Sequence, residues 1–517
     1  MAQEHKMTGK VQLNKRQKDM LFYLSLVVLG LLLFRIPGNG QPIIYDDSHS
    51  YMTVLRYTEG VMPIYPLFLQ LNQFLFGENA YLMAVTWEQA VFATLCLLVF
   101  VKMIKGKFDL PYWVSYGCFL LTMLPFTTDL PEGMTTQAIL TEGIAYAAFY
   151  LFMAAVLKTV WEKRLLWFGV LILLVAFLAS TRAQLQMLYG VCGLLFFYLM
   201  ITGNRKGKSR RFLCGIAGIA GCLIISLAGV WATSRISSAY QQFIVRNVLE
   251  YQEELAMMQG ESTQNTEQDK EENRAKVEKS VAAPNQYVTL LLSRTMYEAE
   301  AQDYQLFPSG EMQALYQTMY EAVEEDQCRY VYATKGLWMW RDIAGGIGRV
   351  GAVCTNAQNL YYEEHADIYA TQDYATIRNQ QQMQIGIALL KEHFGRFLYH
   401  TLLLMPQAFI STVFFQIAPI YLLCHLITLF LYLSAIALMV WAFMDKKADN
   451  RKAAFMAVVL GVNLVLVGVI SIIFFGQQRY LVYNFGIFYI SYFMLLLELW
   501  ETHGKSWITR WKEKRKS

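Results

Sequence analysis

The chain has 517 residues, of which 55% are hydrophobic, 15% aromatic and only 16% charged. This composition is too apolar for an ordinary soluble protein, in which about a quarter of the residues are charged. The net charge of +4 says little about partners because it averages over both sides of a membrane, and we expect no nucleic acid among them.

The recurring apolar runs predict an all-α polytopic membrane protein with about ten transmembrane helices. The first run, Leu21 to Phe34, follows a basic arm and precedes no small-residue cleavage site, so we predict an uncleaved anchor. The predicted spans are residues 19–35, 81–101, 111–127, 135–157, 165–180, 184–202, 212–232, 418–443, 453–475 and 481–500.

Basic residues are concentrated in every second connection between these spans. Lysine and arginine collect in cytoplasmic loops, so the alternation places both termini in the cytoplasm of a multi-pass protein of the cell (cytoplasmic) membrane. The basic clusters lie at residues 6–18, 102–107, 158–164, 205–211, 446–452 and 512–516. The acidic connections are then expected to face outside.

Three domains follow from this topology. Cys328 and Cys354 fall in the middle domain, which is polar, and they are able to form a disulfide if that domain is extracytoplasmic. The domains are residues 1–232, a transmembrane module with a first outer loop at 36–80 that contains amphipathic juxtamembrane helices; residues 233–395, a mainly helical extracytoplasmic polar domain; and residues 396–517, a second transmembrane module with a basic tail.

One stretch, Phe394 to Phe443, is long enough for two spans, and two spans would reverse the orientation of part of the chain. Pro406 and Pro419 interrupt it, and its first half is diluted by polar residues. We therefore predict a helix that lies in the membrane interface, followed by a single span.

The polar residues of the predicted outer face come from distant parts of the sequence. The first outer loop carries the acidic pair Asp46 and Asp47, followed by His49. Carboxylates near a bilayer are costly when desolvated, which makes them functional candidates. The other members of this set are Asp129, Glu132, Glu142, Arg182, Arg479 and Tyr480. Carboxylates together with isolated arginines suit a site that handles a phosphate group and a proton.

Sugar transfer from a lipid phosphate needs this combination of carboxylates and arginines. The acceptor hydroxyl must lose a proton, for which a carboxylate is the natural general base. The leaving phosphate is already a stable anion, so cations aimed at its oxygens replace a general acid. One acidic cluster with one or two arginines is therefore a complete minimal set.

The order and spacing of four motifs resemble membrane glycosyltransferases of the GT-C fold, in the branch of the protein O-mannosyltransferases and aminoarabinose transferases. The motifs are Asp46-Asp47 with Pro63-Ile64-Tyr65-Pro66 after it, Leu140-Thr141-Glu142-Gly143, Ser180-Thr181-Arg182, and Gly476-Gln477-Gln478-Arg479-Tyr480. The resemblance covers about residues 19–232 and 420–500 and does not account for 233–395. Ala183 is a departure, because proline often follows this arginine in such proteins.

The resemblance implies an inverting enzyme that moves a sugar from a polyprenyl-phosphate donor to a hydroxyl or amine outside the membrane. The acceptor would be a cell-surface polymer, lipid or protein. Asp46 or Asp47 matches the catalytic base, and the pattern does not decide between them. The implied donor-phosphate residues are Arg182, Arg479 and Tyr480, with His49, Asp129 and Glu142 as supporting polar groups.

Plainer roles remain open for each of these residues. Asp46 and Asp47 suit the first turn of a helix, where carboxylates complement free N–H groups. Arg182 and Arg479 suit interfacial anchors. No histidine has metal-ligand spacing, and the cofactor stays unknown, although a divalent cation that bridges carboxylate and phosphate is compatible with the residues.

Two other functions stay open. A transporter or flippase for a lipid-linked saccharide normally keeps its polar residues near the bilayer midplane on broken helices with internal repeats. A polymer ligase or polymerase that uses a diphosphate-linked donor would suit the large polar region 233–395. Glycine-rich nucleotide loops are absent, because Gly345-Gly346-Ile347-Gly348 lacks the lysine and the strand-loop-helix context.

Overall fold

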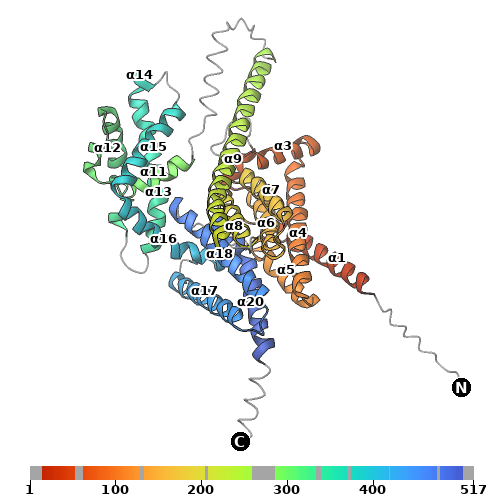
Figure 1. Cartoon of the computed structure of the whole chain (residues 1–517). Coiled ribbons are helices and arrows are strands. Elements are labelled where there is room, and N and C mark those ends of the chain that lie inside the picture. The colour runs from red at the N-terminus through yellow and green to blue at the C-terminus, as the bar shows by residue number, and fades with distance from the viewer. Residues whose placement is uncertain are drawn as a thin grey trace, which may run out of the picture.

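The computed structural model describes residues 14–52, 62–128, 133–203, 208–258, 286–333, 339–369, 374–417, 420–473 and 478–504. Within these ranges every named element is a helix, so the all-α prediction is confirmed there (Figure 1). One isolated bridge, between Ile43 and Ala138, is the β-type contact recorded in the described part of the chain.

Among the described residues, seven helices are long and apolar enough to cross a membrane, which agrees with the prediction of a polytopic membrane protein. They are Tyr81–Phe108 (α4), Glu142–Glu162 (α6), Ala183–Thr202 (η2, Ala183–Met187, with α8, Leu188–Gly203), Leu213–Ile244 (within α9), Tyr421–Met444 (α17), Asn450–Ile473 (α18) and Gln478–Gly504 (α19 to η7, the latter Trp500–Gly504). Three further predicted spans form shorter or more polar helices: α1 (Lys15–Leu33), α5 (Tyr112–Thr127) and α7 (Leu165–Thr181). The total of ten spans stays a prediction.

Helix α6 lies at the centre of the membrane bundle. Of its best 18-residue apolar window, 83% is buried. Small residues, including Ala145, Ala147 and Ala148, let α4 and α7 approach it closely. Helix α17, by contrast, exposes leucine and phenylalanine along its length, as expected where a helix faces lipid.

The predicted span at 135–157 begins later than expected. Residues 135–141 are not helical, and α6 starts at Glu142. A polar side chain satisfies backbone carbonyl groups of this buried segment. Gln89 Nε2 donates to the carbonyl oxygens of Thr136 at 3.1 Å and Ala138 at 3.2 Å. Irregular backbone inside a membrane protein is stable where protein groups take its hydrogen bonds. Glu142 is therefore the first residue of its helix, not one a turn or two inside it.

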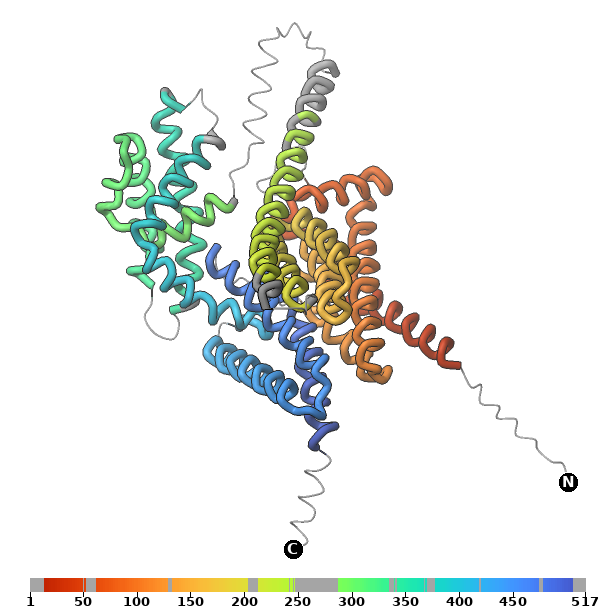
Figure 2. The backbone as a smooth tube through the Cα atoms, viewed as in Figure 1, coloured from red at the N-terminus to blue at the C-terminus, as the bar shows by residue number. Residues whose placement is uncertain are grey.

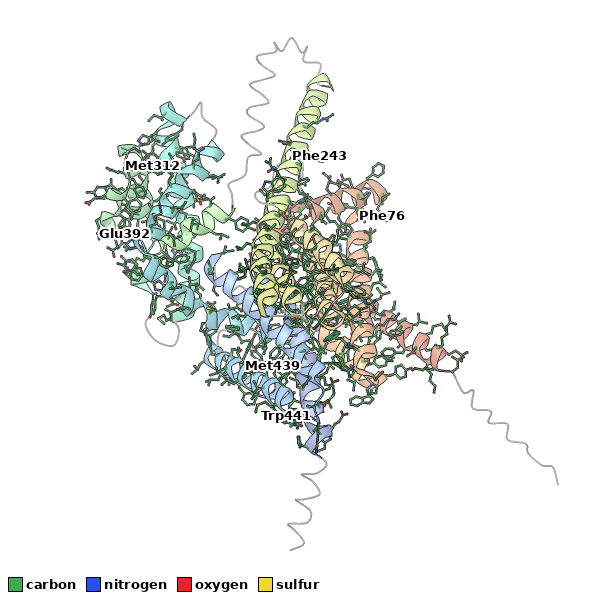
Figure 3. The ribbon with its side chains drawn as sticks, in the orientation of Figure 1. Phe76, Phe243, Met312, Glu392, Met439 and Trp441 are labelled. Carbon is green, nitrogen blue, oxygen red and sulfur yellow. The ribbon has the colours of Figure 1, made fainter. Side chains whose placement is uncertain are left out.

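A second hydrophobic core lies beside the membrane bundle in a lobe made of α11 (Gln286–Met296), η3 (Ala301–Leu306), α12 (Gly310–Glu325), η4 (Tyr330–Tyr332), α13 (Met339–Glu364), α14 (Ala366–Tyr369) and α15 (Tyr374–Glu392) (Figures 1 and 2). Leu292, Leu315 and Ile347 are fully buried in this core. Figure 3 shows Met312 and Glu392 in the lobe, apart from Met439 and Trp441 of α17. Cys328 and Cys354 are both buried free thiols.

The predicted boundary at residue 232 falls inside α9 (Lys208–Met258), a helix of 51 residues. At about 1.5 Å per residue such a helix is more than twice as long as the hydrocarbon layer of a bilayer, about 30 Å, is thick. The apolar pattern identifies the membrane part of this helix, but nothing in the pattern requires the helix to end where the apolar run ends.

The lobe is joined to the membrane bundle by α16 (Phe394–Val413). His393 Nε2 lies 2.7 Å from Asp303 Oδ2, and Arg396 pairs with Glu300. The hydrogen bond from Arg396 lowers the pKa of the Glu300 carboxyl below its usual range. Farther along α16, His400 pairs with Glu298. These three side-chain contacts fix the start of α16 to the segment that follows α11.

The stretch Phe394 to Phe443 forms two helices, α16 and α17, of which α17 alone belongs to the seven membrane candidates. Pro406 was expected to interrupt the stretch, but it lies inside α16. Pro419 lies outside the described residues. A proline inside a helix is tolerated where neighbouring groups satisfy the freed carbonyl.

Gly486, near the start of α20 (Phe485–Leu499), marks the closest approach of α20 to α5. A Cβ atom there would lie 2.7 Å from the carbonyl oxygen of Leu121 and 2.9 Å from Cα of Thr122. Because both are backbone atoms, the helices must separate to admit a side chain. This contact places the residues just before α20.

We expect Gly486→Ala to destabilise the protein by about 1–3 kcal/mol, since overpacking forces backbone shifts. Gly461→Ala in α18 is the matched control, because its added methyl meets no atom within 4 Å. Thermal unfolding in detergent micelles measures both. Equal melting temperatures for the two variants would contradict the close approach of α20 and α5.

Candidate functional site

The site begins with Glu142, the first residue of α6. Its side chain is only 2% exposed, and its Oε1 lies 2.7 Å from Nη1 of Arg182. Thr141 Oγ1 donates to the other carboxylate oxygen at 3.1 Å. The N-terminus of a helix favours a negative charge, so α6 itself stabilises this buried carboxylate.

Arg182 follows directly after α7 (Leu165–Thr181), where the chain turns extended. Its buried guanidinium donates from Nε to Gln184 Oε1 at 3.1 Å and from Nη1 to Tyr483 OH at 3.3 Å. Together with Glu142, these partners fix the plane of the guanidinium. A plain snorkelling anchor would instead direct its charge outward to the headgroups.

Arg479 lies in α19 (Gln478–Leu481), next to the first outer loop. Its Nη1 is 2.7 Å from Asp47 Oδ2 and 3.9 Å from Glu142 Oε1. Asp47 belongs to the first turn of α2 (Asp46–Met52), more than 400 residues away in the sequence. Asp47, Glu142, Arg182 and Arg479 thus form one alternating series of charges, which we call the charged cluster.

Tyr480 lies between the two guanidinium groups. The Cζ atoms of Arg182 and Arg479 are 5.0 Å and 5.3 Å from its ring centroid. Arg479 Nη2 also donates to the Tyr480 hydroxyl at 3.3 Å. The ring therefore attracts both cations through its face and holds two like charges close together.

Tyr51 of α2 closes the cluster from the side of the outer loop. Its ring packs edge-on against Tyr65 of α3 (Ile64–Phe76), with centroids 5.3 Å apart. Burial, and then the negative charge of Glu142, raise the pKa of Tyr51 to about 12. The hydroxyl thus stays protonated at neutral pH and is available as a hydrogen-bond donor.

The structure brings together five of the predicted site residues: Asp47, Glu142, Arg182, Arg479 and Tyr480. Asp46 and His49 are exposed on the same short helix α2, and Asp46 is in none of the ion pairs of the described residues. The predicted candidates Asp129 and Glu132 lie outside the described residues.

Sequence reasoning missed Tyr51, Gln184 and Tyr483 as parts of the site. Tyr51 follows Asp47 by four residues, which on a helix is the same face, so the spacing was a usable signal. Tyr483 also follows Arg479 by four residues, but the helix changes type between them. No local pattern distinguished Gln184.

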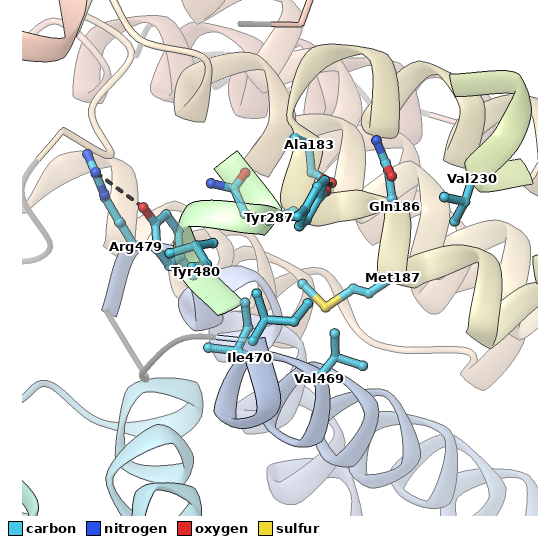
Figure 4. Close-up of a pocket in the computed structure, with 12 residues that line it drawn as sticks. Ala183, Gln186, Met187, Val230, Tyr287, Val469, Ile470, Arg479 and Tyr480 are labelled. Atoms are coloured by element: carbon cyan, nitrogen blue, oxygen red, sulfur yellow. Dashed lines mark hydrogen bonds between the residues drawn. The ribbon is translucent and has the colours of Figure 1, made fainter. Parts of the chain in front are cut away.

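An apolar pocket of about 530 Å³ adjoins the charged cluster (Figure 4). Arg479 and Tyr480 line one part of it, and aliphatic side chains line most of the rest. The lobe contributes to the wall through α11, where Tyr287 OH donates to the carbonyl oxygen of Ala183 at 2.8 Å. The other lining residues are Gln184, Gln186, Met187, Val230, Leu290, Val469, Ile470 and Ile473.

No protein family, curated protein or solved structure matches this chain. The resemblance to the GT-C fold therefore rests on the sequence motifs, and the interpretation of the site rests on its geometry. Among the residues that the structure describes, no three His, Cys, Asp or Glu side chains lie together as a metal site would require.

We expect Glu142→Gln to destabilise the protein by about 3–5 kcal/mol, because it leaves the buried Arg182 charge without its partner. Glu162→Gln, at the other end of α6, is the matched control. Glu162 lies 3.9 Å from both Lys158 and Arg164 in partly exposed pairs, each worth at most about 1 kcal/mol, and a glutamine can still accept the hydrogen bond from Trp167. Unfolding in detergent micelles measures both variants. Similar losses would show that the Glu142 pair is not structurally dominant.

Proposed function

We propose that this chain is an inverting GT-C-type glycosyltransferase that moves a sugar from a polyprenyl-phosphate donor to an acceptor hydroxyl or amine at the outer face of the membrane. The observation that carries the proposal is that the charged cluster and the apolar pocket adjoin each other. Arg479 belongs both to the charged cluster and to the lining of the apolar pocket, and Tyr480, whose ring contacts Arg479, lines the same pocket. A lipid with a phosphate head needs such a junction, since its two ends require opposite surroundings.

The donor phosphate binds at the guanidinium groups of Arg479 and Arg182 in this proposal. Guanidinium presents planar donors that match phosphate oxygens, and such charge-assisted hydrogen bonds are strong. The lipid chain lies along the apolar pocket, where each buried methylene contributes about 0.8 kcal/mol. Pockets of several hundred Å³ are the usual size for ligands, so the pocket holds the part of the chain nearest the head.

Asp47 is the proposed general base. Its Oδ2 takes the proton of the acceptor hydroxyl while the acceptor oxygen attacks the anomeric carbon from the side opposite the phosphate. The bond between that carbon and the phosphate oxygen breaks, its electron pair leaves with the phosphate, and the configuration inverts. Arg479 and Arg182 stabilise the charge that develops on the leaving group. Asp46, exposed on the same turn, is placed to orient the acceptor.

Glu142 acts as a positioning residue. It neutralises Arg182 within the protein and lies within 3.9 Å of Arg479, so it fixes both guanidiniums without touching the sugar. In the predicted topology of ten spans with both termini in the cytoplasm, this site opens to the outside. The lobe then lies on the acceptor side, where it recognises or shields the acceptor.

We expect Asp47→Asn to reduce sugar transfer by about 10²–10⁴-fold, the usual contribution of a general base. The assay uses the purified full chain with a radiolabelled polyprenyl-phosphate sugar and a mixture of candidate acceptors. Asp46→Asn is the matched control, for which we expect a smaller loss. Full transfer by the Asp46→Asn, Asp47→Asn double variant would refute the assignment, and activity only with a diphosphate-linked donor would favour a polymerase or ligase.

Ile473→Ala should weaken binding of long-chain polyprenyl phosphates because Ile473 lines the apolar pocket. The substitution removes three carbon atoms, and losing part of their contact with the lipid costs about 1–2 kcal/mol, or about five- to thirtyfold in affinity. The adjacent Ile472→Ala is the control, since Ile472 is 51% exposed on the outside of α18. Equal effects of the two variants in a binding titration would place the lipid chain elsewhere.

A further inference from the structure

We propose that Arg479 is a latch on the catalytic carboxylate, which the donor phosphate opens. In the structure Arg479 holds Asp47; a phosphate that binds Arg479 takes its place and frees Asp47 Oδ2 for the acceptor proton. This inference rests on the function proposed above and adds an order of events to it: the donor must bind before the base can act.

The charge balance of the cluster is the first argument. Two guanidinium groups face two carboxylates, with Arg182 paired to Glu142 and Arg479 paired to Asp47. The positive charge of Arg479 is therefore already used within the protein. An incoming phosphate anion gains full use of this cation only by replacing one of the carboxylates.

Burial decides which carboxylate gives way. The Glu142 side chain is 2% exposed and its partner Arg182 is 8% exposed, so separating them would leave buried charges unpaired, which is strongly unfavourable. The Asp47 side chain is 54% exposed and water can solvate it once it is released. The pair between Asp47 and Arg479 is accordingly the one that opens.

Arg479 has two further partners besides Asp47. Its Nη1 lies 3.9 Å from Glu142 Oε1, and its guanidinium lies over the Tyr480 ring with a hydrogen bond from Nη2 to the hydroxyl. The cation is thus held by two fixed partners and one exchangeable one. A phosphate meets an oriented guanidinium without any rearrangement of α19.

The release of Asp47 changes what its oxygen can do. In the structure Oδ2 accepts a hydrogen bond from Arg479 Nη1 at 2.7 Å, and this charge-assisted bond makes the oxygen a weaker base. After exchange the same oxygen is available to an acceptor hydroxyl beside the bound donor. Proton removal is thereby confined to the complex in which the sugar is present.

The latch predicts that the Asp47→Asn variant binds the donor phosphate more tightly than the native chain, although it loses sugar transfer. A gain in ligand affinity is unusual when a catalytic residue is replaced. Losing an exposed competing ion pair should tighten binding by about two- to fivefold. The measurement is a titration of the purified full chain in lipid nanodiscs with undecaprenyl phosphate. A parallel titration with inorganic phosphate should show weaker binding but the same ratio between variant and native chain, because the exchange occurs at the phosphate.

Asp46→Asn is the matched control, since it removes the same charge one residue away and touches no partner in the cluster. A gain in Asp47→Asn that clearly exceeds the gain in Asp46→Asn supports the latch. Equal gains, or weaker binding by Asp47→Asn, overturn it and leave only a general effect of net charge. Unchanged thermal unfolding of both variants shows that the comparison concerns folded protein.

The two proposals fail in different ways. If neither the native chain nor any variant binds undecaprenyl phosphate, the function as a lipid-phosphate transferase is wrong. If all of them bind it and Asp47→Asn shows no gain over Asp46→Asn, the function stands and the latch is wrong.

Discussion

The buried ion pair between Glu142 and Arg182 is the interaction on which the rest of the site depends. Each partner stands at a helix end inside the membrane bundle, where water cannot compensate a missing charge. Because α6 supports the carboxylate and α7 carries the arginine, the pair fixes two helices relative to each other. The more exposed charges, on Asp47 and Arg479, are then arranged around this neutral centre.

The two predicted transmembrane modules contribute residues to the same point. The first supplies Asp47, Glu142 and Arg182, and the second supplies Arg479 and Tyr480. The contact of Gly486 with the backbone of α5 brings the start of α20 against the first module, and the short helix α19 precedes α20 by one 3-10 turn, Val482–Asn484. Packing between modules therefore creates the site, while neither module contains a complete set of charges.

The helical, polytopic character of the fold could be predicted from the sequence because the apolar runs are long and the bilayer sets their length. The meeting of Asp47, Arg182 and Arg479 could also be anticipated, since topology placed all three at one face. The start of α6 could not: Gln89, almost fifty residues upstream, supplies the hydrogen bonds that make residues 135–141 irregular.

Two other differences between the prediction and the structure also have causes that the local sequence does not show. Pro406 lies within a helix because tertiary contacts outweigh the local cost of proline, and α9 continues past its apolar part because a helix ends only where its hydrogen bonds end. The partners Gln184 and Tyr483 carried no sequence signal, because their role depends on where Arg182 points.

The hydrogen bond from Tyr287 to Ala183 has a consequence for how such a protein diversifies. This bond joins α11, which lies in the region that the GT-C resemblance does not cover, to the backbone beside Arg182. Helix α11 also supplies part of the apolar wall of the pocket. Under the proposed function, mutations in α11 would change which isoprenoid fits the pocket without replacing a reacting group. Part of the lipid specificity would then lie in the lobe, outside the helices that carry the charged cluster.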